Sequence, residues 1–167
     1  MQEVTHQRSM ILVRPAGPDD AGAVAKVDAS ATATLRQTYR PNEKAFANRK
    51  RISRELRRVV ALLDGQVVGT IQYYLDGSSL AIIGLGVLDE FRRRGVARAL
   101  IEALAESARQ HGACDVVVRT VKETGNVPIF ECLGFHVVSE TPDTFSESEE
   151  YSELTDVELQ MATGKHC

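Results

Sequence analysis

The spacing of hydrophobic positions alternates along this chain between the two-residue period of strands and the 3.6-residue period of helices. Apolar runs rich in β-branched residues predict strands at residues 11–13, 59–63, 67–74, 80–88, 116–118, 135–138 and 155–161. Helical spacing predicts helices at about 21–35, 42–56, 93–111 and 127–133. This order predicts a mixed sheet with helices on both sides, in the α/β or α+β class.

Two short turn signals connect three of the predicted strands. Asp64-Gly65 and Asp76-Gly77 separate the runs at 59–63, 67–74 and 80–88. Such pairs favour tight hairpins, because glycine and aspartate accept the backbone angles that these turns require. The sequence therefore predicts an antiparallel meander in the middle of the chain.

Length and composition place the chain among ordinary globular proteins. With 167 residues it forms one domain, which we expect at 11–162, after a disordered N-terminal extension at 1–10 and before a C-terminal tail at 163–167. A net charge of −3 argues against a general nucleic-acid binder, and no apolar run reaches the length of a membrane helix. Three widely spaced cysteines fit neither a disulfide framework nor a zinc site, so we expect reduced thiols, no metal and a cytoplasmic location.

The run Arg92-Arg93-Arg94-Gly95-Val96-Ala97 lies between an apolar strand and an amphipathic helix. A helix N-terminus presents unpaired backbone N–H groups and the positive end of the helix dipole, which together bind phosphate. Gly95 has no side chain to obstruct a phosphate, and the arginines add charged donors. The alternative to a phosphate site is that the run is simply the solvent-exposed, basic first turn of a helix. The run matches neither the dinucleotide fingerprint nor a Walker P-loop.

Two segments of the chain resemble one family. The stretch from Leu85 to Leu100, which contains Arg-Arg-Gly-Val-Ala, is similar to the acetyl-CoA signature of the GNAT superfamily, (Gln/Arg)-x-x-Gly-x-(Gly/Ala). The downstream Phe130-Glu131-Cys132-Leu133-Gly134-Phe135 is similar to the superfamily's second landmark, in which an aromatic residue and Glu precede Leu-Gly-Phe. Two landmarks in the right order are far more specific than one.

The resemblance implies a single-domain GNAT fold, with a mostly antiparallel central sheet whose strands splay apart to admit the arm of coenzyme A. It implies an N-acetyltransferase that moves an acetyl group from acetyl-CoA to a primary amine by direct attack in a ternary complex. The residues that it implies for cofactor binding are Leu85, Gly86, Val87, Arg92, Arg93, Arg94, Gly95, Val96, Ala97, Arg98, Asn126 and Phe130.

The catalytic residues are less clear from the sequence. Many members of the superfamily carry a tyrosine, as general acid, where this chain has Phe130, which has no proton to donate. The predicted strand at 80–88 contains no carboxylate that could serve as the base, and Arg119 stands near the position where some relatives carry a Glu. Tyr74 and Tyr39 remain as candidates, with ordinary packing as the alternative for both.

Charge is distributed unevenly around the expected acceptor cleft. Residues 140–158 hold eight acids and no Lys or Arg, whereas residues 36–58 hold nine basic residues and two acids. The acidic segment, with Glu147, Glu149, Glu150 and Glu153, could attract a cationic amine; the alternative is that both segments are solvated or pair with each other.

Two other functions stay open at this stage. One is a catalytically weak CoA-binding regulatory or interaction module, which the missing acid and base would fit. The other is nucleic-acid binding through Arg49, Lys50, Arg51, Arg54, Arg57 and Arg58, which the net charge makes the weaker reading. The sequence leaves the acceptor, the acyl-chain preference and a homodimer open.

Overall fold

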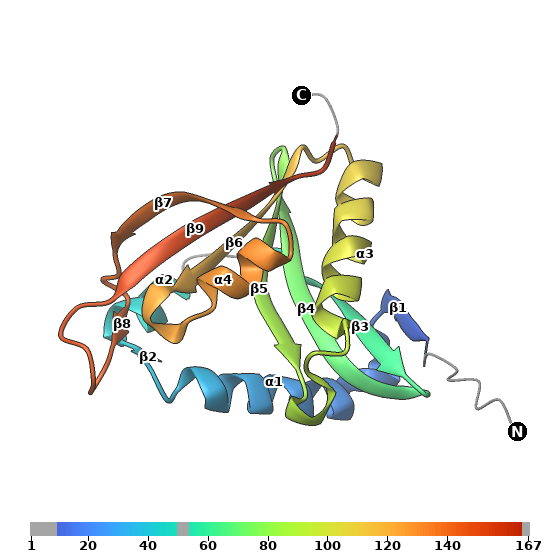
Figure 1. Ribbon diagram of the computed structural model, residues 1–167, viewed down its shortest axis with the longest axis horizontal. Coiled ribbons are helices and arrows are strands. Elements are labelled where there is room, and N and C mark those ends of the chain that lie inside the picture. Colours follow the sequence, from blue (N-terminus) through green and yellow to red (C-terminus); the bar gives the residue numbers. More distant parts are fainter. Residues whose placement is uncertain (1–9, 50–53, 165–167) are drawn as a thin grey trace, which may run out of the picture.

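A seven-stranded sheet forms the centre of the computed structural model, which describes residues 10–49 and 54–164 (Figure 1). Its strand order is β1-β3-β4-β5-β6-β9-β7. The strands are β1 (Ile11–Pro15), β3 (Arg57–Leu63), β4 (Gln66–Asp76), β5 (Ser79–Val87), β6 (Asp115–Val121), β7 (His136–Pro142) and β9 (Thr155–Ala162). Residues 1–9 of the predicted extension and 165–167 of the predicted tail lie outside the described residues.

The helices are α1 (Ala21–Leu35), α2 (Glu43–Arg49), α3 (Val96–Gln110) and α4 (Val127–Cys132). A small second sheet joins β2 (Arg40–Pro41) to β8 (Ser146–Glu147). All pairs in the main sheet are antiparallel except β5 with β6. The predicted class, a mixed and mostly antiparallel sheet with helices, is confirmed.

The predicted meander is formed by β3, β4 and β5. Asp64 (φ 50°) and Gly65 (φ 79°) both have positive φ between β3 and β4, which is the geometry of a two-residue hairpin turn whose twist matches that of the strands. Local turn chemistry was therefore enough to predict these pairings.

Two glycines let helices pack closely on opposite faces of the meander. A Cβ on Gly69 of β4 would lie 2.7 Å from Val96 of α3, and one on Gly86 of β5 would lie 3.1 Å from Val27 and Ala31 of α1. Gly86 pairs with Thr70, the neighbour of Gly69, and successive residues of a strand face opposite sides. Hence α1 and α3 cover different faces.

The apolar stripe predicted for the third helix is the one that α3 buries. Its buried residues are Val96, Leu100, Ile101, Leu104 and Ala108, and they join the core with Ile71, Leu80, Val116 and Leu159 from the sheet. Ala97 is half-buried at the edge of this stripe.

The second helix is shorter than the pattern predicts. It ends at Arg49, residues 50–53 lie outside the described residues, and 54–56 are not helical. Arg54 instead lies over the ring of Tyr74 at 4.3 Å and pairs with Asp76 of β4 at 3.5 Å. These contacts hold Arg54 beside β4, in a non-helical segment that leads into β3. Tertiary contacts thus outweigh the helical spacing of the sequence at this point.

An ion pair anchors β1 to the start of α1 and should give the fold a pH dependence. Asp20, 8% exposed, accepts hydrogen bonds from Arg14 (2.7 and 3.0 Å) and from the Gly17 amide (2.7 Å). The Arg14 hydrogen bonds, with the Gly17 amide, lower the pKa of Asp20 to about 2.

Because the folded pKa lies below the ordinary value of 3.8, the stability from this carboxylate is present above about pH 4 and is lost as the pH falls through about 2. Asp20→Asn should lower the melting temperature at pH 6, and the difference from the native chain should shrink toward pH 2. The exposed neighbour Asp19 provides the control, since Asp19→Asn should leave both melting curves nearly unchanged. A difference that stays constant with pH would contradict the assignment.

Candidate active site

The turn before α3 leaves its first backbone amides available. Gly95 is the N-cap of α3 with φ 83°, and it supplies no side-chain cap. The first hydrogen bond of the helix is donated by the Ala99 amide to the Gly95 carbonyl (3.0 Å). The backbone amides of Val96, Ala97 and Arg98 therefore have no carbonyl acceptor in a preceding helical turn. A Cβ on Gly95 would meet nothing within 4 Å. The arrangement can bind an anion through backbone N–H groups.

The four arginine side chains around this turn differ in their contacts. Arg92 pairs with Asp89 (2.8 Å), Arg94 lies over the Phe91 ring (5.3 Å), and Arg98 donates to the Cys132 carbonyl (3.0 Å). Arg93 has φ 62°, an uncommon angle for a residue with a side chain and one often found at ligand-binding turns. Three of the guanidinium groups therefore also stabilise the fold.

Strands β5 and β6 separate halfway along their length. Their parallel pairing covers Ser79–Ile82 with Asp115–Val118 and goes no further. At the same point the β4–β5 register shifts and Ile83 becomes an extra residue, and such a bulge bends its strand. The segment from Gly84 to Val87 continues to pair with β4, so its other edge, which includes the backbone of Leu85 and Val87, faces the gap. A free strand edge of this kind can hydrogen-bond an extended ligand.

Helix α4 brings the second landmark to the start of α3. The Arg98 side chain, bonded to the Cys132 carbonyl, connects the first turn of α3 to the end of α4. Asn126 precedes α4 and is half-buried, and Phe130 is 8% exposed and packs edge-on against Phe135 with 5.7 Å between ring centroids. The candidate cofactor residues of the two landmarks thus belong to adjoining elements.

A cavity of about 410 Å³ borders the half of β6 that does not pair with β5. Its lining includes Arg119, Thr120 and Val121, which directly follow the last residue of β6 that pairs with β5. Tyr39, from the loop between α1 and β2, lines the same cavity. The sequence candidate Tyr39 is therefore next to the strand separation.

Asp156 of β9 is a carboxylate in this cavity that the sequence analysis did not single out. Its side chain is 26% exposed and lies 3.6 Å from Arg119. Burial raises the pKa of the Asp156 carboxyl, Arg119 opposes that rise, and the charges of Asp143 and Glu158 add to it. The only signal in the sequence was its place among the eight acids of 140–158.

Tyr74, the other tyrosine candidate, lies on β4 beside Ala81 of β5. It is half-buried beneath the Arg54 guanidinium and does not line the cavity that contains Tyr39. Its neighbour Tyr73 is 7% exposed and belongs to the core. The structure thus gives the two adjacent tyrosines different surroundings.

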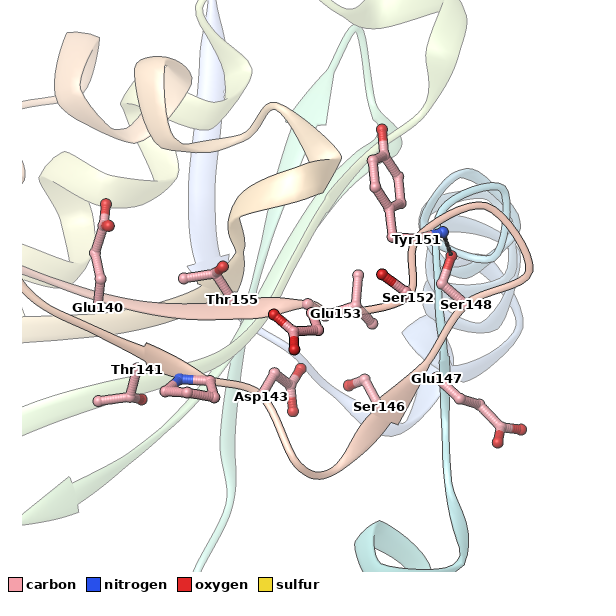
Figure 2. Close-up of a pocket in the computed structure, with 12 residues that line it drawn as sticks. Glu140, Thr141, Asp143, Ser146, Glu147, Ser148, Tyr151, Ser152, Glu153 and Thr155 are labelled. Carbon is pink, nitrogen blue, oxygen red and sulfur yellow. Dashed lines mark hydrogen bonds between the residues drawn. The ribbon is translucent and has the colours of Figure 1, made fainter.

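A second cavity, of about 570 Å³, lies in the connection between β7 and β9. Its carboxylates are Glu140, Asp143, Glu147 and Glu153, and no Lys or Arg of the described residues lines it. Figure 2 shows Glu147 directed away from Asp143 and Glu153, in accord with its ion pair to Arg40 (2.8 Å). Glu140 pairs with Lys122 (3.2 Å).

The acidic and basic segments meet in the small β2–β8 sheet. Arg40 contacts Glu147 and also Glu149 (3.9 Å). The backbone N–H of Asn42 donates to the Phe145 carbonyl (3.0 Å). The alternative that the two segments pair therefore holds for Arg40. Two of the basic residues considered for nucleic-acid binding, Arg54 and Arg58, pair with acids of the domain. Lys50 and Arg51 lie outside the described residues.

The profile of the Acetyltransferase (GNAT) family matches residues 27–135, which is more than half of the chain and includes both landmarks. The chain belongs to the GNAT acetyltransferase family. A curated acetyltransferase of Photorhabdus laumondii is 40% identical over 74 residues, which cover 44% of this GNAT chain and 51% of that protein. The match thus spans about half the length of that relative.

Solved structures agree with this GNAT protein in fold. The ribosomal-protein-S18-alanine N-acetyltransferase of Escherichia coli superposes with a TM-score of 0.72 at 15% identity, over 95% of this chain and 97% of that one. The protein yncA of Salmonella typhimurium, solved with its cofactor acetyl-CoA, gives 0.69 at 18% identity over the same two fractions. At these identities the likeness concerns the fold.

No group of three or more His, Cys, Asp or Glu in 10–49 and 54–164 could hold a metal ion. Within the same residues, no helix combines the length and apolar character needed to cross a membrane.

Proposed function

We propose that this GNAT protein is an N-acetyltransferase that transfers an acetyl group from acetyl-CoA to a primary amine. The observation that supports this best is the separation of β5 from β6 after Ile82 and Val118. The N-terminus of α3 follows β5, and the cavity with Tyr39 and Asp156 borders the half of β6 that does not pair with β5. The gap would thus have an anion-binding turn on one strand and carboxylates beside the other.

The residues around the gap fit coenzyme A. The backbone amides from Gly95 to Arg98 would hold the pyrophosphate, with the Arg93 side chain adding positive charge. The free edge of β5 at Leu85 and Val87 would bond the pantetheine amides, as a neighbouring strand would. Asn126 and Phe130 would border the same arm from α4. When bound, acetyl-CoA supplies the thioester that the amine attacks.

The chain's own groups would have to manage the protons. A protonated amine has no lone pair, so a base must take a proton before attack, and the departing thiolate must gain one. Tyr39 lines the cavity beside the gap and is the candidate proton donor; Tyr74 is the alternative. Direct attack within a ternary complex needs no covalent acetyl-enzyme.

The test is transfer itself. The purified chain would be incubated with acetyl-CoA and a panel of amines, the free thiol of CoA measured, and the acetylated amine identified by mass. Amine-dependent thiol release is the expected result. Binding of CoA without release for any amine would support the alternative, a CoA-binding regulatory or interaction module.

We further propose that the acceptor is cationic, because the 570 Å³ cavity has acidic lining residues and, within the described part of the chain, no basic ones. Glu153 lines it, is exposed, and forms no ion pair within 10–49 and 54–164.

Glu153→Gln should raise KM for a polyamine severalfold with kcat little changed, and the KM of the native chain should rise with salt. Glu102→Gln, on the exposed face of α3, is the control of equal charge. A preference for neutral or anionic amines, insensitive to Glu153, would contradict this proposal.

A further inference from the structure

The cavity that borders β6 contains carboxylates with different environments, and the difference bears on proton transfer. Asp156 and Glu158 both extend from β9 on the face opposite the core residues Val157 and Leu159. Both lie near Arg119 of β6, with 3.6 Å from Arg119 to Asp156 and 3.2 Å to Glu158. Only Asp156 of these two lines the cavity.

Glu158 is occupied by hydrogen bonds. Its Oε2 accepts from Arg119 (3.2 Å) and its Oε1 from Gln160 (3.4 Å). Asp143, the other acid of the cavity, accepts a bond from the Phe145 amide (2.8 Å). No hydrogen bond to the Asp156 carboxylate is found within 10–49 and 54–164, so both of its oxygens can accept a proton or an N–H group.

We propose that Asp156 is the general base, which takes a proton from the ammonium group of the acceptor; this rests on the proposed N-acetyltransferase function. One proton passes from the ammonium to the Asp156 carboxylate. The neutral nitrogen then forms the C–N bond to the acetyl carbon as the C–S bond breaks. The second nitrogen proton goes to the departing thiolate, and Asp156 returns its proton to solvent. One ammonium and one thioester thus give one amide, one thiol and one proton.

The surroundings of Asp156 suit this role. The charged groups that act on it are Arg119 on β6, Glu158 on β9 and Asp143 after β7. Tyr39, on the loop after α1, lines the same cavity. Burial raises the pKa of its carboxyl, with Arg119 in opposition and the two acids adding to the rise. A carboxylate whose pKa is moved toward neutrality accepts a proton more readily than an exposed one.

The position of Asp156 is held by backbone structure. It pairs in register with Val121 of β6 and with Thr141 of β7, and the amide of the preceding Thr155 donates to Glu123 (3.0 Å). A group fixed between two strands is positioned more precisely than one on a free loop.

The experiment compares the native chain with Asp156→Asn, which keeps the shape and removes the base. We expect kcat near pH 7 to fall about 100-fold for an acceptor resembling the lysine amine, whose pKa is about 10.4. The deficit should be smaller for an α-amine of pKa about 8, and it should narrow for both as the pH approaches the pKa of the amine, because a neutral acceptor needs no base.

Two further variants separate this role from a structural one. Asp156→Glu retains a carboxylate and should recover much of the rate. Asp143→Asn removes one charge from the same cavity, and because Asp143 raises the pKa of Asp156, its loss should shift the acid limb of the pH profile to lower pH without abolishing it. CoA-induced thermal stabilisation should persist in all three variants.

Several results would overturn the assignment. A fall in kcat that is equal for both amines and constant with pH would make Asp156 structural, and a raised KM with unchanged kcat would make it an anchor for the ammonium. If the native chain releases no CoA with any amine, the proposed function fails together with this inference; if it does and Asp156→Asn keeps the native profile, only the inference fails.

Discussion

Gly95→Val is expected to abolish the binding of coenzyme A while leaving the domain folded. Gly95 caps α3 with φ 83°, and a Cβ there would meet no protein atom within 4 Å. The substitution therefore causes no internal clash, but a β-branched residue does not tolerate this angle. The turn must change its backbone, and the amides that would hold the pyrophosphate then point elsewhere.

The measurement is thermal stabilisation by CoA. A ligand at 100 times its Kd stabilises the native state by about 2.7 kcal/mol, which raises the melting temperature of a domain of this size by roughly 5–11 °C. The native chain should show such a shift at millimolar CoA, and Gly95→Val should show none.

Gly65→Val provides a matched control for the backbone strain. Gly65 has φ 79° and nothing within 4 Å of its added Cβ, but it lies in the turn between β3 and β4. Both variants should lose some stability, and only Gly95→Val should lose the response to CoA. An unchanged CoA response in Gly95→Val, or an absent response in the native chain, would contradict the proposed binding site.

Gly69→Val is expected to cause a large loss of stability. The added Cβ would lie 2.7 Å from Val96 Cγ1, 3.2 Å from Leu100 Cδ1 and 3.3 Å from the Gly86 carbonyl oxygen. Val96 and Leu100 are both buried in the core, so neither can move aside freely. Overpacking of this kind costs about 3 kcal/mol, or roughly 6–12 °C in melting temperature.

Gly84→Val on the adjacent strand is the control. Gly84 pairs with Gln72 of β4, yet a Cβ there would meet nothing within 4 Å, so this change should alter the melting temperature little. Because Val96 is the first residue of α3, Gly69→Val should also weaken CoA binding. Equal melting temperatures for the two variants would show that α3 can shift without cost.

Local patterns in the sequence were sufficient wherever structure depends on neighbours in the chain. The meander followed from the turns Asp64-Gly65 and Asp76-Gly77, and the buried stripe of α3 from spacing alone. The resemblance to the acetyl-CoA signature pointed to the turn at Gly95 as the expected anion site, because a strand, a glycine and a helix start lie within a few residues there. The GNAT family was recognisable from the same residues.

The acceptor side was not predictable in the same way. Tyr39 and Arg119, 80 positions apart, line one cavity, and Arg40 meets Glu147 across 107 positions. β2 and β8 are each two residues long, which is too short for an alternation of apolar and polar residues to reveal a strand in the sequence. The second helix was overestimated because the contacts of Arg54 with Tyr74 and Asp76 do not appear in helical spacing.

The sequence by itself therefore determined the order of elements, the family and the turn expected to bind the cofactor, since each depends on residues that are close together in the chain. The tertiary structure decided where β5 parts from β6 and which acids of residues 140–158, Asp143 and Asp156, line the cavity beside β6. Asp156 and Glu158 are almost equally exposed (26% and 24%), but only Asp156 lines the cavity with Tyr39. Which acid lines a cavity depends on strands and loops that are distant in sequence.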